Sequence, residues 1–516
     1  MFIPIALASV QLGTAKTIRV PEEHKTIQAG IDAAEDGDSV LVSAGRYHEQ
    51  LSMKTGVTVI SAGGDERGEA GLLRAEKTVL DGGGAAGPAG VTMSESATLD
   101  GFTVTNVGKY DDALWTKHHA TQGEQQAHEH IGAPGIPGVA ITGVTCVVRN
   151  NIVHHNGYSG IAITSVDGKK CSPLVTGNTC YRNMGAGIGS MHGSRATIAD
   201  NLCYENYFAG IGHNGASPTV TGNTCHSNIR AGIGISEGSS PIVRANRCYR
   251  NRRAGIGVRT GANTQPLVEE NQCYENDMAG IGSEEEARPI IRNNKCYKNK
   301  LAGIGSRGGA RPTLIGNECF ENVLAGIGLS DNVTALVVGN HSHHNQLAGI
   351  GFAACESGSA TVADNRFVDN KTVAAGIHGG WKVHFSGNTL SRKGGMPPIV
   401  MVFEGAEATF IANTINGGGV AAFRVAGTLH ADHNKLLGES VRKAGPPNFA
   451  VWALEGADVR LCGNEIRSWR HAIVADRARV DATRNHIRDF HGEAFVVRDP
   501  IEPSRIEDND IDPGAD

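Results

Sequence analysis

Residues 271–283 read NQCYENDMAGIGS, and residues 294–306 read NKCYKNKLAGIGS, so the same unit is written twice. The frame Asn-x-Cys occurs seven times at spacings of 23, 22, 23, 25, 23 and 23 residues. Its cysteines are Cys180, Cys203, Cys225, Cys248, Cys273, Cys296 and Cys319. A period of this kind is typical of a solenoid, in which each repeat buries its apolar face only against its neighbours.

Each repeat contains three short β runs separated by turns. A second Asn follows the first by five residues, and the motif Ala-Gly-Ile-Gly (AGIG) comes next, eight times between Ala186 and Gly351. The period predicts one coil of a parallel β-helix, in which equivalent residues lie about 4.8 Å apart. We therefore expect columns of inward Cys and Ile side chains, hydrogen-bonded Asn stacks at the turns, and outward tyrosines after the cysteines.

The stacked cysteines raise the question of disulfides. Side chains on in-register parallel strands point the same way, which is poor geometry for bridging. We expect free buried thiols in a narrow core. The alternative is a stacked metal or redox site, and insulation from solvent argues against it because a reactive thiolate needs a polar, accessible setting.

Composition narrows the class of protein. Glycine supplies 69 of 516 residues and aromatics only 5 %, which favours many tight turns over one large core. A net charge of −6 argues against a nucleic-acid partner, and the apolar stretches are too short for a membrane span. Residues 1–15 fit a secretion signal or its remnant, and alternatively a first strand or cap segment. We expect a secreted or periplasmic monomer.

The repeat extends beyond its cysteines. Weaker frames continue from Asn340 to Asn509, and earlier ones lie at Asn151 and at residues 99–104. We therefore predict an N-terminal cap at 16–54, with a short amphipathic capping helix at 26–34, and one β-helix domain at 55–512. A loop at 107–137 interrupts it.

The order of the N-terminal segments adds a resemblance. The helix at 26–34, the segments 37–42 and 45–49, and Thr78-Val79-Leu80-Asp81-Gly82 resemble the start of right-handed parallel β-helix proteins of the pectate-lyase-like superfamily. The coils are similar to its PbH1 repeats, whose members include NosD-like copper-associated proteins and carbohydrate-active proteins. The resemblance implies an all-β, right-handed parallel β-helix. It transfers no catalytic residue, because this fold hosts lyases, hydrolases, epimerases and proteins with no known activity.

The inserted loop is the first candidate site. Where a regular coil uses about three residues, some thirty intervene, and Lys117 to His130 contain four histidines. In an extended segment His128 and His130 point to one side, which suits a chelate. We take His118, His119, His128 and His130 as candidate ligands of a divalent metal, Ca or Cu/Zn. The alternatives are a polar loop without a metal and a substrate lid.

The second candidate site is the outer face of the sheet formed by the AGIG strands. The residues after AGIG bring His192, His213, Glu237 and Arg259 forward as catalytic candidates. Candidate substrate-binding residues are Tyr110, Trp115, Lys169, Met191 and Asn214. The alternation of Glu237, Arg259, Glu284, Arg307 and Asp331 is equally what a salt-bridged surface ladder looks like, with small energies per pair.

These features favour an enzyme that acts on polysaccharide, of lyase, hydrolase or epimerase type, in a groove beside the loop. One alternative is a NosD-like accessory protein that handles copper. Another is a non-catalytic solenoid that binds glycans or serves as structure.

Overall fold

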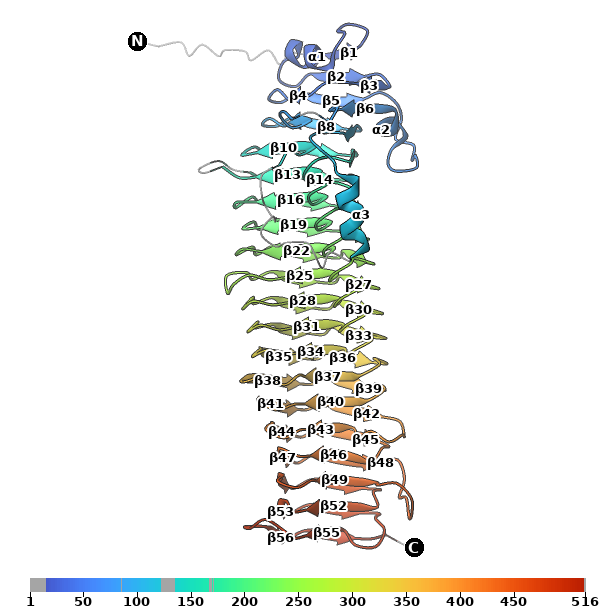
Figure 1. Ribbon diagram of the computed structural model, residues 1–516, viewed down its shortest axis with the longest axis vertical. Helices are drawn as coiled ribbons and strands as arrows, with labels where there is room; N and C mark the ends of the chain where they lie inside the picture. The colour runs from blue at the N-terminus through green and yellow to red at the C-terminus, as the bar shows by residue number, and fades with distance from the viewer. Residues whose placement is uncertain (1–14, 85, 122–134, 167–168, 170, 515–516) are drawn as a thin grey trace, which may run out of the picture.

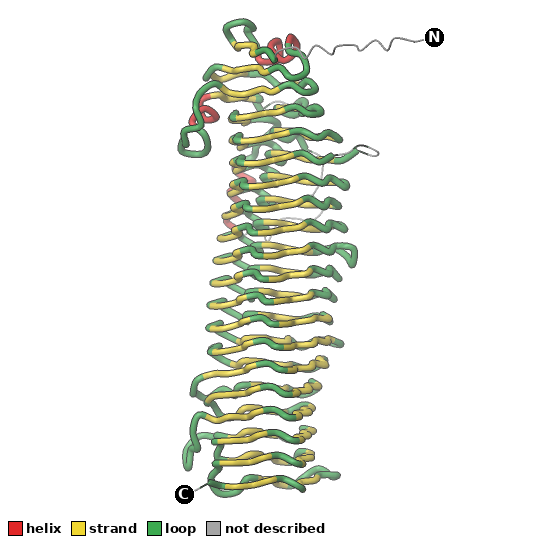
Figure 2. The backbone as a smooth tube through the Cα atoms, turned by 180° about the vertical axis from the view of Figure 1, so that it is seen from behind, coloured by secondary structure: helices red, strands yellow, loops and turns green. Residues whose placement is uncertain are grey.

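The computed structural model describes residues 15–84, 86–121, 135–166, 169 and 171–514. The chain winds as a parallel β-helix from α1 at one end to β56 at the other (Figure 1). Figure 2 shows the same stack of coils from behind, with strands in almost every turn. Each coil adds one strand to each of three parallel sheets, so the predicted all-β solenoid is confirmed.

The first sheet contains the strand that opens each coil. Its strands are β1 (Thr17–Val20), β2 (Ser39–Val42), β5 (Thr58–Ser61), β8 (Thr98–Asp100), β11 (Val147–Arg149), β14 (Leu174–Thr176), β17 (Thr197–Ala199), β20 (Thr219–Thr221), β23 (Ile242–Arg244), β26 (Leu267–Glu269), β29 (Ile290–Arg292), β32 (Thr313–Ile315), β35 (Thr334–Val338), β38 (Gly358–Ala363), β41 (Trp381–Ser386), β44 (Glu407–Ile411), β47 (Thr428–Asp432), β50 (Asp458–Cys462), β53 (Arg479–Thr483) and β56 (Arg505–Glu507).

The second sheet, called the cysteine sheet below, contains the Asn-x-Cys strands. Its strands are β3 (Gly45–Tyr47), β6 (Thr78–Asp81), β9 (Thr103–Thr105), β12 (Ile152–His154), β15 (Thr179–Tyr181), β18 (Leu202–Tyr204), β21 (Thr224–His226), β24 (Arg247–Tyr249), β27 (Gln272–Tyr274), β30 (Lys295–Tyr297), β33 (Glu318–Phe320), β36 (His341–His343), β39 (Arg366–Val368), β42 (Thr389–Arg392), β45 (Thr414–Gly417), β48 (Lys435–Gly438), β51 (Glu465–Arg467), β54 (His486–Arg488) and β57 (Asp510–Asp512).

The third sheet, called the AGIG sheet below, contains the glycine-isoleucine strands. Its strands are β4 (Leu51–Ser52), β7 (Val91–Thr92), β10 (Val139–Thr142), β13 (Ile161–Thr164), β16 (Ile188–Met191), β19 (Ile211–Asn214), β22 (Ile233–Ser236), β25 (Ile256–Val258), β28 (Ile281–Ser283), β31 (Ile304–Ser306), β34 (Ile327–Leu329), β37 (Ala348–Phe352), β40 (Val373–Ile377), β43 (Val400–Val402), β46 (Ala421–Val425), β49 (Phe449–Ala453), β52 (His471–Asp476) and β55 (Phe495–Arg498).

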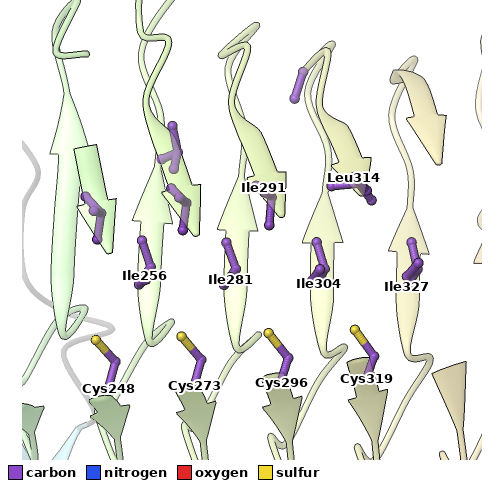
Figure 3. Packing of buried hydrophobic residues seen from close by; sticks show 14 of the residues in the cluster. Cys248, Ile256, Cys273, Ile281, Ile291, Cys296, Ile304, Leu314, Cys319 and Ile327 are labelled. Atoms are coloured by element: carbon purple, nitrogen blue, oxygen red, sulfur yellow. The ribbon is translucent and has the colours of Figure 1, made fainter. Parts of the chain in front are cut away.

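In the coils that carry the Asn-x-Cys and AGIG motifs, the core contains columns of identical side chains stacked in register. Cys273 pairs with Cys296 and Ile281 with Ile304 in adjacent strands. Figure 3 shows the Cys and Ile columns facing one another across the interior. All seven frame cysteines are free and fully buried, which confirms the prediction of free thiols. Burial raises the pKa of Cys180 and Cys203, so these thiols stay protonated and unreactive.

The turn asparagines form two buried ladders, as predicted. The Asn271 amide nitrogen donates to Asn294 Oδ1 at 2.9 Å and to the Val243 carbonyl at 2.9 Å. The Asn271 main-chain N–H also donates to Asn294 Oδ1, at 2.9 Å. Repetition of this pattern in each coil satisfies the buried turn groups, which would otherwise carry a desolvation penalty.

Outside the cysteine sheet, the residues after Cys form a stack of aromatic rings. Tyr249, Tyr274 and Tyr297 lie with ring centroids 4.9 Å apart, the spacing of in-register parallel strands. The predicted outward position of these tyrosines is therefore confirmed.

The N-terminal end carries the predicted capping helix. It is α1 (Ile27–Ala33), with Thr26 Oγ1 accepting from the Ala29 N–H at 3.2 Å as its N-cap. Ile27 and Ile31 of α1 are buried in the same core as the first coils. The strands β1 and β2 within the predicted 16–54 cap already pair in parallel with the first sheet.

Two further helices interrupt the coils, α2 (Leu73–Lys77) and α3 (Asp112–Ala120). Helix α3 lies in the predicted 107–137 insertion and was not predicted as a helix. Within the described residues, no helix is long and apolar enough to span a membrane. Of the predicted leader 1–15, all but Ala15 lies outside the described residues.

Candidate functional site

A groove of about 660 Å³ runs along the outer face of the AGIG sheet. Its described lining extends from Tyr158 and Ser159 to Met401 and Phe403. The distance between the coils of Ser159 and Val373 corresponds to about 40 Å at the spacing of parallel strands. The site is therefore long and narrow, and a chain molecule fits it better than a compact one.

The floor of the groove consists of two columns of the smallest side chains. One is the alanine of the AGIG motif and the other is its second glycine. The columns are Ala186, Ala209, Ala231, Ala254, Ala279, Ala302, Ala325 and Ala348, and Gly189, Gly212, Gly234, Gly257, Gly282, Gly305, Gly328 and Gly351.

The two glycines of the motif are present for different reasons. At the first glycine, Gly280, a Cβ would lie 2.7 Å from the Gly303 carbonyl oxygen and 2.8 Å from Asn299 Nδ2. Packing inside the coil excludes a side chain there. At the second glycine, from Gly212 to Gly351, a Cβ would meet an alanine Cβ at 3.4 to 3.8 Å, an ordinary contact. Packing inside the coil therefore requires glycine at the first position of the motif and not at the second.

The groove has two walls. The turn wall comes from residues just before each AGIG: Phe208, Arg230, Arg253, Met278, Leu301, Leu324 and Leu347. The strand-end wall comes from residues two positions after the second glycine: Met191, Asn214, Ser236, Arg259, Glu284, Arg307 and Ser330. The groove is thus apolar along the turn wall toward its C-terminal end and carries charge in its middle.

Three arginines gather in the middle of the groove. Burial lowers the pKa of Arg230 to about 9, and the neighbouring Arg253 and Arg259 lower it further in the same direction. Burial and then Arg259 also lower the pKa of Arg253. Arg307 Nη2 lies 2.5 Å from Glu284 Oε2, so one pair of the anticipated surface ladder is formed. The positive charges predict a preference for anionic ligands.

The helix α3 packs on the turns beside the N-terminal part of the turn wall. Trp115 Nε1 donates to the Glu205 carbonyl at 2.8 Å, and Trp115 forms a small apolar cluster with Tyr207 and Ile229. The Arg182 guanidinium lies 4.3 Å from the Trp115 ring centroid. The described part of the insertion is therefore attached to the coils by Trp115.

Of the four predicted catalytic residues, His213 and Arg259 are among the residues that line the groove, whereas His192 and Glu237 are not. His192 and Glu237 have positive φ values of 53° and 55° and lie exposed in the turns after β16 and β22. Arg259 lines the groove. His213 belongs to the inward column, 3 % exposed, between Ser190 and Ile235 of the neighbouring strands. Burial lowers its pKa to about 3.

The expected outer position of His213 differs from the structure because of strand alternation. Ile211 points inward, so the residue two positions later points inward as well. The same alternation places Gly212 and Asn214 outside. Applied strictly to the repeat, this rule places the second glycine on the outer face from sequence, but it does not place the alanine, which precedes the strand two positions before the inward isoleucine.

The predicted substrate-binding residues lie in three places. Met191 and Asn214 line the groove. Tyr110 and Trp115 lie on or near α3, where Tyr110 packs edge-on against His155 at 4.7 Å and burial raises its pKa to about 12. Lys169 is exposed in the turn after β13. The arginines and leucines of the turn wall were not predicted, because the sequence period alone does not show which turn residues border a groove.

The predicted metal ligands are partly described. His118 is buried with its ring edge-on to Tyr207 at 5.3 Å, while His119 stacks on Trp115 at 4.7 Å. Arg252 Nη2 lies 3.2 Å from His119 Nε2. His128 and His130 lie outside the described residues. The two described histidines thus pack in the interface between α3 and the coils.

Comparisons with known proteins agree with this architecture. The family model described as "Right handed beta helix region" matches residues 135–266 and 261–390. No curated protein sequence matches the chain.

Three solved structures have similar folds although their sequences differ widely from that of this chain. The A-module of mannuronan C-5 epimerase AlgE4 from Azotobacter vinelandii is 15 % identical over 78 % of this chain and 94 % of that one, with a TM-score of 0.34. A mutant of the periplasmic alginate epimerase AlgG is 12 % identical over 72 % and 83 %, with a TM-score of 0.40. An N-terminal fragment of bacteriophage phi29 gene product 12 is 11 % identical over 94 % and 89 %, with a TM-score of 0.46.

These likenesses concern the fold alone, and nothing about activity follows from them. The family match and the three parallel sheets agree on the architecture of the coils. The chain is a right-handed parallel β-helix protein.

Proposed function

We propose that the groove on the AGIG sheet binds an extended polysaccharide that carries carboxylate groups. The observation that supports this most directly is the column of second glycines. Glycine weakens a strand by roughly 0.5–1 kcal/mol relative to alanine, yet Gly212 to Gly351 have room for a Cβ. Glycine within a strand is typical of a site where a ligand approaches the backbone closely.

The shape of the groove suits a linear chain of sugars. The floor is flat because it consists of one column of alanines and one column of glycines, and the turn wall offers Met278, Leu301, Leu324 and Leu347. Apolar side chains of this kind pack against the C–H faces of sugar rings. The strand-end wall offers polar groups such as Asn214 and Ser236 for the hydroxyls.

Charge supports an acidic polysaccharide over a neutral one. Besides burial, Arg253 and Arg259 lower the pKa of Arg230, and Arg259 lowers the pKa of Arg253, so the three guanidinium groups lie close together. A carboxylate near this cluster gains charge-assisted hydrogen bonds with planar, bidentate geometry. A uronate polymer offers one carboxylate on each sugar.

The side chains of the groove bear on the type of reaction. Hydrolysis of a glycosidic bond uses two carboxyl groups about 5 to 9.5 Å apart. Among the described lining residues Glu284 alone carries a carboxylate, and Arg307 holds it. Binding, or elimination or epimerisation at a uronate, therefore fits the groove better than hydrolysis. We place the protein outside the cytoplasm, secreted or periplasmic, as a single β-helix domain over 55–512.

The test measures binding of polysaccharides to the full chain by isothermal titration calorimetry. A polyuronate is compared with a neutral glucan at low and high salt. We expect tighter binding of the polyuronate, weakening with salt. Gly282→Val fills the floor from a position where a Cβ meets only Ala254 Cβ at 3.8 Å, so folding is retained. We expect this variant to lose at least about tenfold in affinity, or about 1.4 kcal/mol.

Thr219→Val, on the exposed side of β20 in the first sheet, is the matched control and binds like the wild type. Equal affinity of Gly282→Val and wild type contradicts the proposal, as does the absence of polysaccharide binding. The same mixtures are assayed for unsaturated uronates, reducing ends and epimerised residues. A product identifies a catalytic site, and binding without product identifies a glycan-binding solenoid.

A further inference from the structure

A second cluster of polar side chains lies on the cysteine sheet, away from the groove. Glu318 in β33 pairs in register with His341 in β36, and His343 lies two residues farther along β36 on the same face. One ligand atom from each of the three residues lies within 4.8 Å of the other two. The Glu318 Oε1 to His343 Nε2 distance is 3.5 Å.

The two imidazoles are held with their Nε2 atoms buried. The His343 ring stacks on Phe320 with centroids 5.2 Å apart and planes 1° apart, which fixes the plane of the imidazole. His343 Nδ1 lies 2.8 Å from His344 Nδ1. Within the described part of the chain, Nε2 of His341 has no hydrogen-bond partner, and the contact of His343 Nε2 is the 3.5 Å ion pair with Glu318 Oε1. Buried polar atoms of this kind require an explanation.

Stacking explains only part of this arrangement. His343 ends the aromatic ladder that runs through Tyr297 and Phe320, so its ring has a structural role. The ladder does not account for His341, whose ring tilts 38° to His343 at 4.3 Å. In the two preceding coils the position of His341 carries Glu318 and Lys295.

We propose that Glu318, His341 and His343 form a binding site for a divalent transition-metal ion that favours imidazole, such as Zn²⁺. A tetrahedral zinc with nitrogen and oxygen ligands at about 2.0–2.1 Å separates its ligands by about 3.4 Å, close to the 3.5 Å between Glu318 and His343. Three protein ligands leave one position for water. Pairing of His343 Nδ1 with His344 supplies the outer contact that orients a metal-binding imidazole.

The surrounding charges select the type of ion. Lys295 Nζ lies 3.0 Å from Glu318 Oε2, which leaves Oε1 toward the histidines. Arg366 pairs in register with His341 on the next strand. With one carboxylate and two cations nearby, the site disfavours Ca²⁺ and Mg²⁺, which prefer several oxygen ligands. Zn²⁺ and Cu²⁺ bind imidazole well and fit this donor set.

The site connects consecutive coils, because β33 and β36 belong to neighbouring turns. A metal bound only in the folded state stabilises it by an amount that grows with metal concentration. The cluster lies on another sheet than the groove, so this inference is independent of polysaccharide binding.

The experiment titrates the chelator-treated full chain with Zn²⁺ by calorimetry and measures bound zinc by elemental analysis after dialysis. We expect His341→Ala to bind one equivalent fewer than the wild type. Glu318→Gln, which leaves the ring stack intact, weakens that equivalent by at least about tenfold. Co²⁺ in place of Zn²⁺ reports the donor set through its visible absorption bands.

The matched control is His486→Ala, since His486 opens β54 as His341 opens β36. It retains the wild-type stoichiometry. Circular dichroism shows that each variant is folded. Equal zinc stoichiometry and affinity in wild type, His341→Ala and Glu318→Gln overturns the proposal, and so does a wild-type chain that binds no zinc. Because the chain has other histidines, the loss of one equivalent is the deciding measurement.

Discussion

At the scale of single residues, the conserved positions of the repeat have distinct structural roles. The cysteine is a small apolar side chain in a narrow core, and all seven frame cysteines are fully buried. The asparagine side chain carries both a donor and an acceptor, so it can form hydrogen bonds with the asparagine of the next coil. The first glycine of AGIG leaves room for the asparagine amide beside it, whereas the second is free to carry a side chain and does not.

The pH dependence of stability tests whether His213 is buried and neutral in the folded protein. Burial lowers its folded-state pKa to about 3, whereas the unfolded value is about 6.5. The unfolded chain therefore binds a proton that the folded chain does not, and stability falls as the pH drops from about 6.5 toward 3. The expected slope from this group is up to about 1.4 kcal/mol per pH unit. We expect His213→Val to flatten that part of the stability curve, measured by urea unfolding at several pH values.

His192 is the matched control for this prediction because it lies exposed in the adjacent coil. His192→Asn suits the left-handed backbone at this position, and we expect it to leave the acid slope of unfolding as it is in the wild type. An unchanged acid slope in His213→Val contradicts the buried, neutral state of His213.

At the scale of elements, the coil is the unit of folding and α3 is an addition to it. Regular coils need no other support, because the asparagine ladders and the in-register core pass from one coil to the next. By contrast, the contacts that hold α3 in the described part of the chain centre on Trp115, with its apolar cluster and its hydrogen bond to Glu205, and include Arg252 on His119 and the Arg182–Asp112 ion pair. Its attachment is therefore a local equilibrium, separate from the stability of the solenoid.

Trp115→Ala is expected to release α3 while the coils remain folded. The change removes the Nε1 hydrogen bond to Glu205, the packing on Tyr207 and the stacking on His119. We expect amide exchange in α3 to become about 30- to 100-fold faster, corresponding to about 2–3 kcal/mol of local stability. Hydrogen-exchange mass spectrometry of residues 112–120 measures this, with the coil peptides as an internal reference.

Leu114→Ala changes the same helix at a side chain that is 37 % exposed, and it serves as the comparison. We expect little change in exchange for that variant. If Trp115→Ala protects α3 as well as the wild type does, Trp115 is not the anchor.

At the scale of the whole molecule, the two ends of the solenoid differ. The N-terminal coil is covered by α1, whose Ile27 and Ile31 are buried in the core. At the other end, all three residues of β56 and of β57 are exposed. Stability in a solenoid is close to a sum of terms between neighbouring coils, so an end with fewer contacts opens first.

We therefore predict a gradient of amide exchange along the chain. The strands β24 to β33, in the middle of the ladders, exchange slowest. The strands β55 to β57 exchange at least about tenfold faster, while β1 and β2 stay protected by α1. Hydrogen-exchange mass spectrometry over a time course measures the order. Uniform protection from β1 to β57, or faster exchange at β1 than at β57, contradicts it.

Much of the fold can be predicted from the sequence because the same pattern of inward, outward and turn residues recurs in many coils. The period, the inward Cys and Ile, the asparagine stacks and the helix at 26–34 all appear in the structure. Less of the candidate site could be predicted from the sequence. The groove was expected on the AGIG sheet, yet its arginines and leucines come from turn positions that vary from coil to coil. The pairing of Glu318 with His341 and His343 depends on register between coils.

The amino-acid sequence by itself determined the coil, since a 23-residue unit that buries nothing alone must stack on its neighbours. It also determined which residues stack, because in-register parallel strands place equivalent positions about 4.8 Å apart. Only the tertiary structure decided which faces of those stacks border solvent, a groove or α3. Alternation along β19 turned His213 inward, and the juxtaposition of β33 and β36 brought a carboxylate to two imidazoles. Such contacts join side chains from different coils, so their geometry depends on the tertiary structure.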